Sequence, residues 1–166
     1  MKDIVLRINR KNLIQNWNDF FYLTILLVFG SIYFMLNNEN YNGVLVFIVF
    51  LAIQFTFTSY LSVKYFYQNR NEVYIIRPDS ITLTKYSKTE VFSTQDINKI
   101  VVCKSANMDS FGMPFSTFER FRLVKVYIYN GRVLILTNLL EYDIEEPLKI
   151  LENVKLERRM GFSFFI

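Results

Sequence analysis

The chain has 166 residues, 52% of them apolar and 17% aromatic, and its formal net charge is +4. One soluble domain of this length does not need so many apolar residues for its core, so part of the apolar surface must be buried elsewhere. The sequence has no histidine, which excludes Ser-His and Cys-His catalytic couples and imidazole metal ligands. Its one cysteine, Cys103, excludes an internal disulfide, and its alternation with Val101 predicts a small buried residue rather than a catalytic thiol.

Residues 1–17 are predicted to be an N-terminal segment on the cytoplasmic side of a membrane. Ile4, Leu6 and Ile8 fall at the period of a strand, before the apolar residues at positions 13, 14 and 17 take up the period of a helix. Two interpretations remain open for the first ten residues. They either add a strand to the sheet of the C-terminal domain or form an amphipathic helix on the membrane surface.

Two long segments without charged side chains follow. Nineteen residues separate Asp19 from Glu39 and twenty-four separate Glu39 from Lys64, equivalent to about 28 Å and about 36 Å of helix. The hydrocarbon core of a bilayer is about 30 Å thick. A pair of buried helices in a soluble bundle is the alternative, but such helices rarely continue this far without a charged residue on one face.

The polar segment NNENYNG, residues 37–43, separates these two stretches. Asn and Gly reverse a chain easily, so seven residues are enough for a tight turn. We therefore expect a transmembrane helical hairpin over residues 18–67, with spans at about 20–38 and 43–63. A signal peptide fits the first span poorly, because the apolar stretch is long and a second span follows it.

The basic residues near the hairpin lie on one side of it. Lys2, Arg7, Arg10 and Lys11 precede the first span, the turn has no Lys or Arg, and Lys64 and Arg70 follow the second span. Basic residues stay on the cytoplasmic side of a membrane. Both termini and the C-terminal domain are therefore expected in the cytoplasm.

Three polar residues, Gln54, Thr58 and Ser62, are spaced by four along one face of the second span. Polar side chains within a bilayer seek partners across helices. They are predicted to make helix contacts inside the membrane, either with the first span alone, near Gly30 and Ser31, or with another helix.

Residues 70–156 have the pattern of a small, mostly antiparallel β domain. Short β-branched and aromatic runs separated by turn residues start at Glu72, Ser80, Glu90 and Ile97. Two further alternating runs flank Asn130-Gly131, which predicts a hairpin closed by a type I′ turn.

The pattern then changes to helical spacing at Ile144, Leu148, Leu151 and Val154, with Glu145 and Glu146 in the first turn. A C-terminal helix is therefore expected to cap the sheet. The acidic cluster formed by Glu141, Asp143, Glu145 and Glu146 either favours the positive end of this helix or holds a divalent ion. The predicted fold class is membrane α+β, with a two-helix transmembrane hairpin and a small antiparallel domain.

The segments YNGRVLILTNLLEYDIEEPLKIL and STQDINKI resemble the last strands and the middle strand of pleckstrin-homology-like (PH-like) domains. With the preceding hairpin, the whole chain is similar to the YcxB-like group of small bacterial membrane proteins. The resemblance implies a PH-like cytoplasmic domain over residues 70–156 and a multi-pass protein of the bacterial inner membrane. It carries over no catalytic residue.

Two apolar segments are candidates for docking a partner. Residues 105–118 form a connection between strands that contains Met108, Phe111, Met113 and Phe115, and they either dock a partner or membrane or complete the core. The tail, residues 157–166, contains Phe162, Phe164 and Phe165 and is expected to dock on a partner, on lipid or on its own domain.

Four basic residues, Lys85, Lys88, Arg158 and Arg159, are candidates for contact with lipid headgroups. Residues 72–166 have thirteen basic and twelve acidic side chains, which disfavours nucleic-acid binding. The sequence has no Gly-rich phosphate loop, and we expect no enzymatic activity, cofactor or metal.

The expected function is a non-enzymatic, membrane-anchored adaptor or accessory subunit of a membrane protein complex. Its expected partners are membrane lipids and a membrane protein. A module that senses anionic lipids is the alternative, followed by a transporter component or an enzyme.

Overall fold

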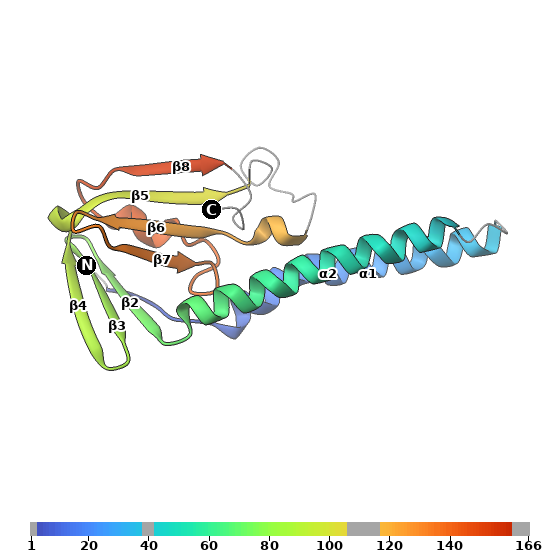
Figure 1. Ribbon diagram of the computed structural model, residues 1–166, viewed down its shortest axis with the longest axis horizontal. Helices are drawn as coiled ribbons and strands as arrows, with labels where there is room; N and C mark the ends of the chain where they lie inside the picture. Colours follow the sequence, from blue (N-terminus) through green and yellow to red (C-terminus); the bar gives the residue numbers. More distant parts are fainter. Residues whose placement is uncertain (1–2, 38–41, 106–116, 161–166) are drawn as a thin grey trace.

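The computed structural model describes residues 3–37, 42–105 and 117–160. Two four-stranded sheets pack against each other, and two long helices project from them to one side (Figure 1). The helices are inserted between the first and second strands of the first sheet, so the β domain is discontinuous in sequence.

The first sheet is antiparallel and has the order β1-β2-β3-β4. Its strands are β1 (Ile4–Leu6), β2 (Glu72–Arg77), β3 (Ser80–Lys85) and β4 (Lys88–Ser93). Strand β1 pairs with β2 in the register Leu6↔Tyr74, which confirms the N-terminal strand and excludes a surface helix at these residues. Leu6 is buried while Val5 is exposed, as expected for the alternating faces of a strand.

The second sheet has the order β7-β6-β5-β8. Its strands are β5 (Ile97–Lys104), β6 (Leu123–Ile128), β7 (Val133–Thr137) and β8 (Leu156–Met160). Strands β5, β6 and β7 are antiparallel, whereas β8 runs parallel to β5. The predicted antiparallel domain is thus correct except for one parallel edge strand.

The predicted C-terminal helix is wrong. Residues Glu146–Ile150 form only a short 3₁₀ helix, η3, with hydrogen bonds from Leu148 N to Glu145 O and from Leu151 N to Leu148 O. Ile144, Leu148 and Leu151 are buried, so the apolar spacing correctly indicated an inward face. The segment cannot continue as a helix because Asn153 has a φ of 60° and the chain then extends into β8.

Two turns of the domain differ from the expected geometry. In the β6–β7 loop, residues 129–132, Gly131 N donates to Ile128 O at 3.0 Å and Gly131 alone has a positive φ, 86°, as in a type I turn followed by a glycine bulge. The two positive φ angles that a type I′ turn requires occur instead at Tyr86 and Ser87, between β3 and β4. Asn-Gly correctly predicted the hairpin but not its turn.

Replacing Gly131 with valine should lower the free energy of unfolding by about 1–3 kcal/mol, because a β-branched residue is strained at positive φ. A Cβ at this position meets no neighbouring atom, so backbone strain is the whole effect. Thermal or denaturant unfolding would measure it. Gly131→Asn is the matched control, since Asn tolerates this conformation, and equal losses for both variants would contradict the explanation.

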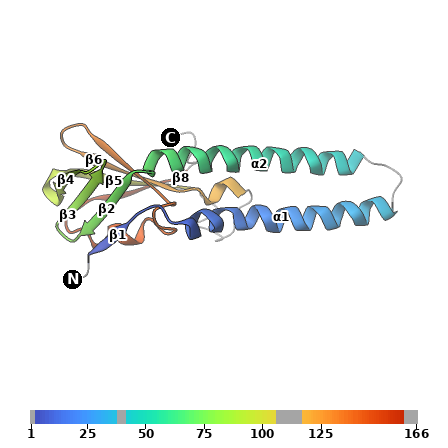
Figure 2. The same ribbon diagram turned by 90° about the horizontal axis from the view of Figure 1, so that it is seen from below.

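The two helices, α1 (Arg10–Asn37) and α2 (Asn42–Asn69), run antiparallel and side by side (Figures 1 and 2). Each has 28 residues, which corresponds to about 42 Å. One described helical segment, Gly43–Asn69, is long and apolar enough to cross a bilayer, with a mean hydropathy of 2.2. The first span remains a prediction.

Apolar side chains form two cores on opposite faces of the second sheet. Between the sheets, the core includes Ile76, Ile81, Val124 and Leu136. On the outer face of the second sheet, Leu61 and Tyr65 of α2 pack with Cys103, Phe121 and Leu139. Each fully buried apolar side chain of this size stabilises the fold by about 1.5–3 kcal/mol. The end of the hairpin that joins the sheets is therefore part of the folded domain.

Candidate functional site

The end of α2 is fixed to the β domain by the buried side chain of Asn69. Its Nδ2 donates to Glu72 Oε2 and to the backbone oxygen of Ile135, both at 2.7 Å. Its Oδ1 accepts from the backbone N of Thr137 at 3.1 Å and from Thr137 Oγ1 at 2.8 Å. All the hydrogen-bonding capacity of this amide is used, as burial requires.

Glu72 continues this network toward the β3–β4 turn. Its buried carboxylate accepts from Tyr74 Oη at 2.8 Å and from Lys85 Nζ at 2.8 Å, in addition to Asn69. Burial, together with the nearby charge of Glu72, raises the pKa of Tyr74, which therefore stays a neutral donor. The last turn of α2 and the first residues of β2 are thus bonded into one unit.

Helix α1 is fixed to the same domain from its other side. Asn9 N donates to Leu139 O at 3.0 Å, and Asn12 Nδ2 donates to the same oxygen at 3.3 Å. One turn further along, Asn138 Nδ2 donates to Asn16 Oδ1 at 2.8 Å, and both amides are fully buried. With a buried contact at each helix, the hairpin is held on the domain in a defined orientation.

The polar stripe of α2 makes contacts that the sequence did not predict. Ser62 bonds α1, by accepting a hydrogen bond from Trp17 Nε1 at 3.0 Å. Gln54 Oε1 accepts from Thr117 N at 3.1 Å and Thr117 Oγ1 at 3.0 Å, and Thr58 Oγ1 lies 2.7 Å from Thr117 Oγ1. The hydrogen bonds of Gln54 and Thr58 thus go to Thr117, and their predicted contact with a helix inside the membrane remains a prediction.

Thr117 begins the 3₁₀ helix η2 (Thr117–Arg120), which lies between α1 and α2 in Figure 2 and contacts both helices. A sequence pattern cannot show that the chain returns from β5 to β6 beside α2, because this contact depends on tertiary structure alone. The β domain thus reaches along the hairpin as far as Gln54.

Beyond that level the hairpin exposes an almost continuous apolar surface. On α1 this surface begins after the exposed residue Asn18. The exposed apolar residues of α1 are Phe21, Tyr22, Ile25, Leu26, Val28, Phe29, Ile32, Tyr33, Met35 and Leu36, and those of α2 up to the same level are Leu45, Val46, Ile48, Val49, Phe50, Ile53, Phe55 and Phe57. A soluble monomer rarely leaves a patch of this kind in water.

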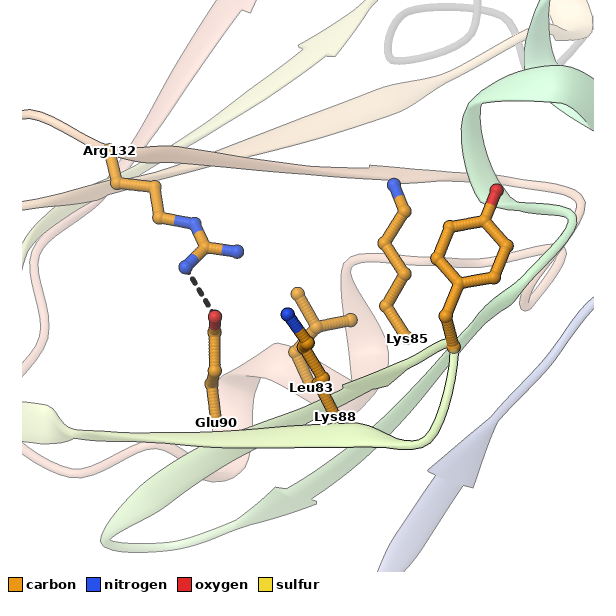
Figure 3. Close-up of a pocket in the computed structure, with 6 residues that line it drawn as sticks. Leu83, Lys85, Lys88, Glu90 and Arg132 are labelled. Atoms are coloured by element: carbon orange, nitrogen blue, oxygen red, sulfur yellow. Dashed lines mark ion pairs between the residues drawn. The ribbon is translucent and has the colours of Figure 1, made fainter.

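A cavity of about 270 Å³ lies beside the β3–β4 turn (Figure 3). Lys85 and Lys88 line it, as does Arg132 of the β6–β7 loop, which sequence reasoning missed because it comes from the other sheet. Two of these cations are already paired, Lys85 with Glu72 at 2.8 Å and Arg132 with Glu90. The positive charge of Lys85 and Arg132 is therefore partly neutralised, which weakens the attraction of the cavity for an anion.

The other two predicted headgroup residues lie elsewhere. Arg158 and Arg159 are on β8, the edge strand of the second sheet, and they line a different cavity from that of Lys85 and Lys88. Arg158 Nε donates to Glu145 at 3.0 Å, and Lys104 Nζ donates to the same carboxylate at 3.3 Å. Burial alone would raise the pKa of Glu145, but the hydrogen bonds from Arg158 and Lys104 hold it below its usual range.

The predicted acidic cluster is divided among separate ion pairs. Glu145 bonds Arg158 and Lys104, Glu146 bonds Lys149, and Asp143 lies 3.7 Å from Arg122. Among the described residues, no group of three acidic or cysteine side chains is placed to hold a metal ion. Cys103 is fully buried, and burial raises the pKa of its thiol.

Seven predicted docking residues lie outside the described residues: Met108, Phe111, Met113 and Phe115 in the β5–η2 connection, and Phe162, Phe164 and Phe165 in the tail. The strands that precede these two segments, β5 and β8, are described as far as Lys104 and Met160. Because β5 and β8 are parallel, Lys104 and Met160 are paired at the same end of the sheet. The described strand ends that precede the two apolar segments are therefore neighbours.

No curated protein matches the chain significantly. The profile of a family described as PH domain matches residues 5–145. The match begins in β1, includes both helices and ends before η3, so it leaves β8 outside. It confirms the PH-like resemblance, whereas the narrower YcxB-like grouping remains a prediction. The match covers most of the chain, including both facing sheets except β8 and the helical hairpin inserted after the first strand. This chain therefore belongs to the PH domain family.

Proposed function

We propose that this protein is a membrane-anchored PH domain that acts as a non-enzymatic adaptor or accessory subunit of a membrane protein complex. A PH domain is commonly a module that binds lipids or proteins. The observation that carries the proposal is the exposed apolar hairpin, bonded rigidly to the domain through Asn69, Asn12 and Asn16.

The position of Thr117 indicates how deep the hairpin would enter a bilayer. Residues 43–53 of α2 lie beyond its contact with Gln54 and extend about 16 Å, less than the hydrocarbon thickness of about 30 Å. The outward face of α2 stays mainly apolar as far as Val63, which adds about 15 Å. The bilayer boundary is thus proposed to pass near η2, with the domain seated on the membrane surface.

Aromatic and basic side chains at the base of the hairpin support this boundary. Lys64 Nζ lies 5.8 Å from the ring centre of Tyr60, and the Arg70 guanidinium lies 4.8 Å from that of Tyr67. Tyr and Trp prefer membrane interfaces, and basic residues favour the cytoplasmic one. We infer a bacterial inner-membrane location with both termini in the cytoplasm.

The neighbouring ends of β5 and β8 support a partner that is itself in or at the membrane. The connection that follows β5 returns at Thr117, which is bonded to α2, and the tail follows directly after β8. The end of β5, where Cys103 packs with Leu61 and Tyr65 of α2, and the paired end of β8 lie close to the hairpin. A protein docked there would lie beside the bilayer.

Anionic-lipid sensing is the second candidate, favoured by the cavity beside the β3–β4 turn. Lys88 is exposed there, but Lys85 and Arg132 bond Glu72 and Glu90. Partly neutralised cations bind anionic headgroups weakly. Protein docking is therefore the stronger proposal.

Affinity purification of the full chain in mild detergent tests the proposal. We expect a membrane protein to copurify in fixed stoichiometry and to be lost when Phe162, Phe164 and Phe165 are changed to serine. Lys85→Glu with Lys88→Glu is the matched control and should retain the partner. Two results together would favour lipid sensing instead: the Lys85 and Lys88 variant no longer binds the membrane or vesicles, and the Phe162, Phe164 and Phe165 variant still copurifies with the partner.

A further inference from the structure

Strand β8 is unlike the other strands of its sheet. It is a five-residue edge strand, the one parallel strand of a sheet that is otherwise antiparallel, and it lies outside the match to the PH domain family. None of its described side chains, at positions 156–159, is buried. The neighbouring strand β5 has a continuous run of buried residues from position 100 to 104.

Backbone hydrogen bonds and ion pairs hold β8 in place. Its ladder on β5 runs from Ile100↔Leu156 to Lys104↔Met160, and Ile100 N donates to Lys155 O at 2.9 Å just before it. On one face, Glu157 bonds Lys99 at 3.1 Å. These are the interactions by which an extended peptide typically binds the edge of a sheet.

The inner face of β8 contributes one strong polar contact. Arg158 remains half-exposed, yet it bonds Glu145, whose side chain is buried and also contacts Lys104. Without Arg158, the Glu145 carboxylate would keep Lys104 as its one described cationic partner, and it would lie beside the edge of β5 that β8 covers. The edge therefore presents a negative group that favours an arginine on any strand that lies there.

We propose that the edge of β5 is a docking surface for an extended segment of a partner protein, and that β8 covers it in this structure as the chain's own ligand. The segment pairs parallel to β5. It carries an acidic residue opposite Val101, facing Lys99, and an arginine opposite Val102, facing Glu145. This surface belongs to the β domain and does not depend on insertion of the hairpin into a membrane.

A strand with few buried side chains opens more readily than the centre of its sheet. Its attachment to the domain nevertheless gives it an effective concentration in the range of millimolar, so a free peptide competes poorly until β8 is weakened. Removing the Arg158 contact while leaving the backbone ladder intact is the least disruptive way to weaken it.

Hydrogen exchange of the full chain in detergent tests the first half of the proposal. We expect the amides of residues 156–160 to exchange faster than those of β6, and Arg158→Ala to accelerate them about tenfold further. Arg159→Ala is the matched control on the same strand and should have little effect. Equal protection of β8 and β6 in all three proteins would overturn the proposal.

Peptide binding tests the second half. A labelled peptide of residues 153–160 should bind the Arg158→Ala chain at least about tenfold more tightly than the same peptide with Arg158→Glu, since the latter places like charge against Glu145. Glu145→Gln in the Arg158→Ala chain should remove that preference. Failure of the unmodified peptide to bind, or a dimer in light scattering that exchanges β8 between two copies, would contradict docking of a separate partner.

Discussion

Asn69→Ala should lower the free energy of unfolding by about 3–5 kcal/mol. Four hydrogen bonds of the buried amide are lost, and Glu72, Thr137 N and Ile135 O each lose a partner. Each buried polar group left unsatisfied costs about 1–3 kcal/mol, more when it is charged. Denaturant unfolding of the full chain in detergent, followed by circular dichroism of the β domain, would measure the loss.

Asn71→Ala is the matched control for this change. Asn71 is two residues further along, is exposed and donates to Tyr86 Oη at 2.9 Å. A surface substitution of this kind should change stability by no more than about 0.5 kcal/mol. Similar losses for the two variants would show that the joint at Asn69 does not hold the hairpin on the domain.

Aspartate at both Phe29 and Val49 should remove the protein from the membrane without unfolding its β domain. Both side chains are exposed on the distal hairpin, far from the contacts of Asn69 and Thr117. A charged residue at the centre of a span costs about 2.5–3.5 kcal/mol, so two should cost about 5–7 kcal/mol. Resistance to carbonate extraction and flotation with vesicles would measure the loss of insertion.

The same double substitution distinguishes a bilayer from water around the hairpin. In water, an exposed aspartate is harmless and increases solubility, so the variant would behave like the original protein. Val91→Asp, on the exposed side of β4, is the matched control and should leave insertion unchanged. An unchanged membrane fraction in the Phe29 and Val49 variant would contradict anchoring by the hairpin.

The sequence predicted the strands well because their alternation directly reports which face is buried. β2 and β5 begin and end where the β-branched runs do, and even the three-residue β1 was visible from Ile4 and Leu6. β8 was missed, since its apolar residue Leu156 is followed by charged residues and its place is determined by a ladder with distant β5. Ile144 and Leu148 suggested a helix by their spacing, but both are buried by an irregular segment in which Ile144 precedes the short 3₁₀ helix η3.

The candidate site was less predictable than the fold. Gln54, Thr58 and Ser62, which the sequence predicted to contact a helix, are buried, but their spacing cannot distinguish a second helix from Thr117 as the partner. Asn69, which joins hairpin and domain, had no signal beyond its position at a helix end. Its four hydrogen bonds go to three residues of β2 and β7, and local patterns do not show such distant pairings.

Depth-dependent quenching of Trp17 tests the central claim that the hairpin is embedded in a bilayer and the domain is seated at its surface. Trp17 is the one tryptophan of the chain, and it packs between the helices against Phe55 while donating to Ser62. In reconstituted vesicles, we expect stronger quenching by lipids brominated near the headgroup than by lipids brominated at mid-chain, and weak quenching by aqueous iodide. Strong quenching by iodide with none from either lipid would place the base of the hairpin in water and contradict the claim.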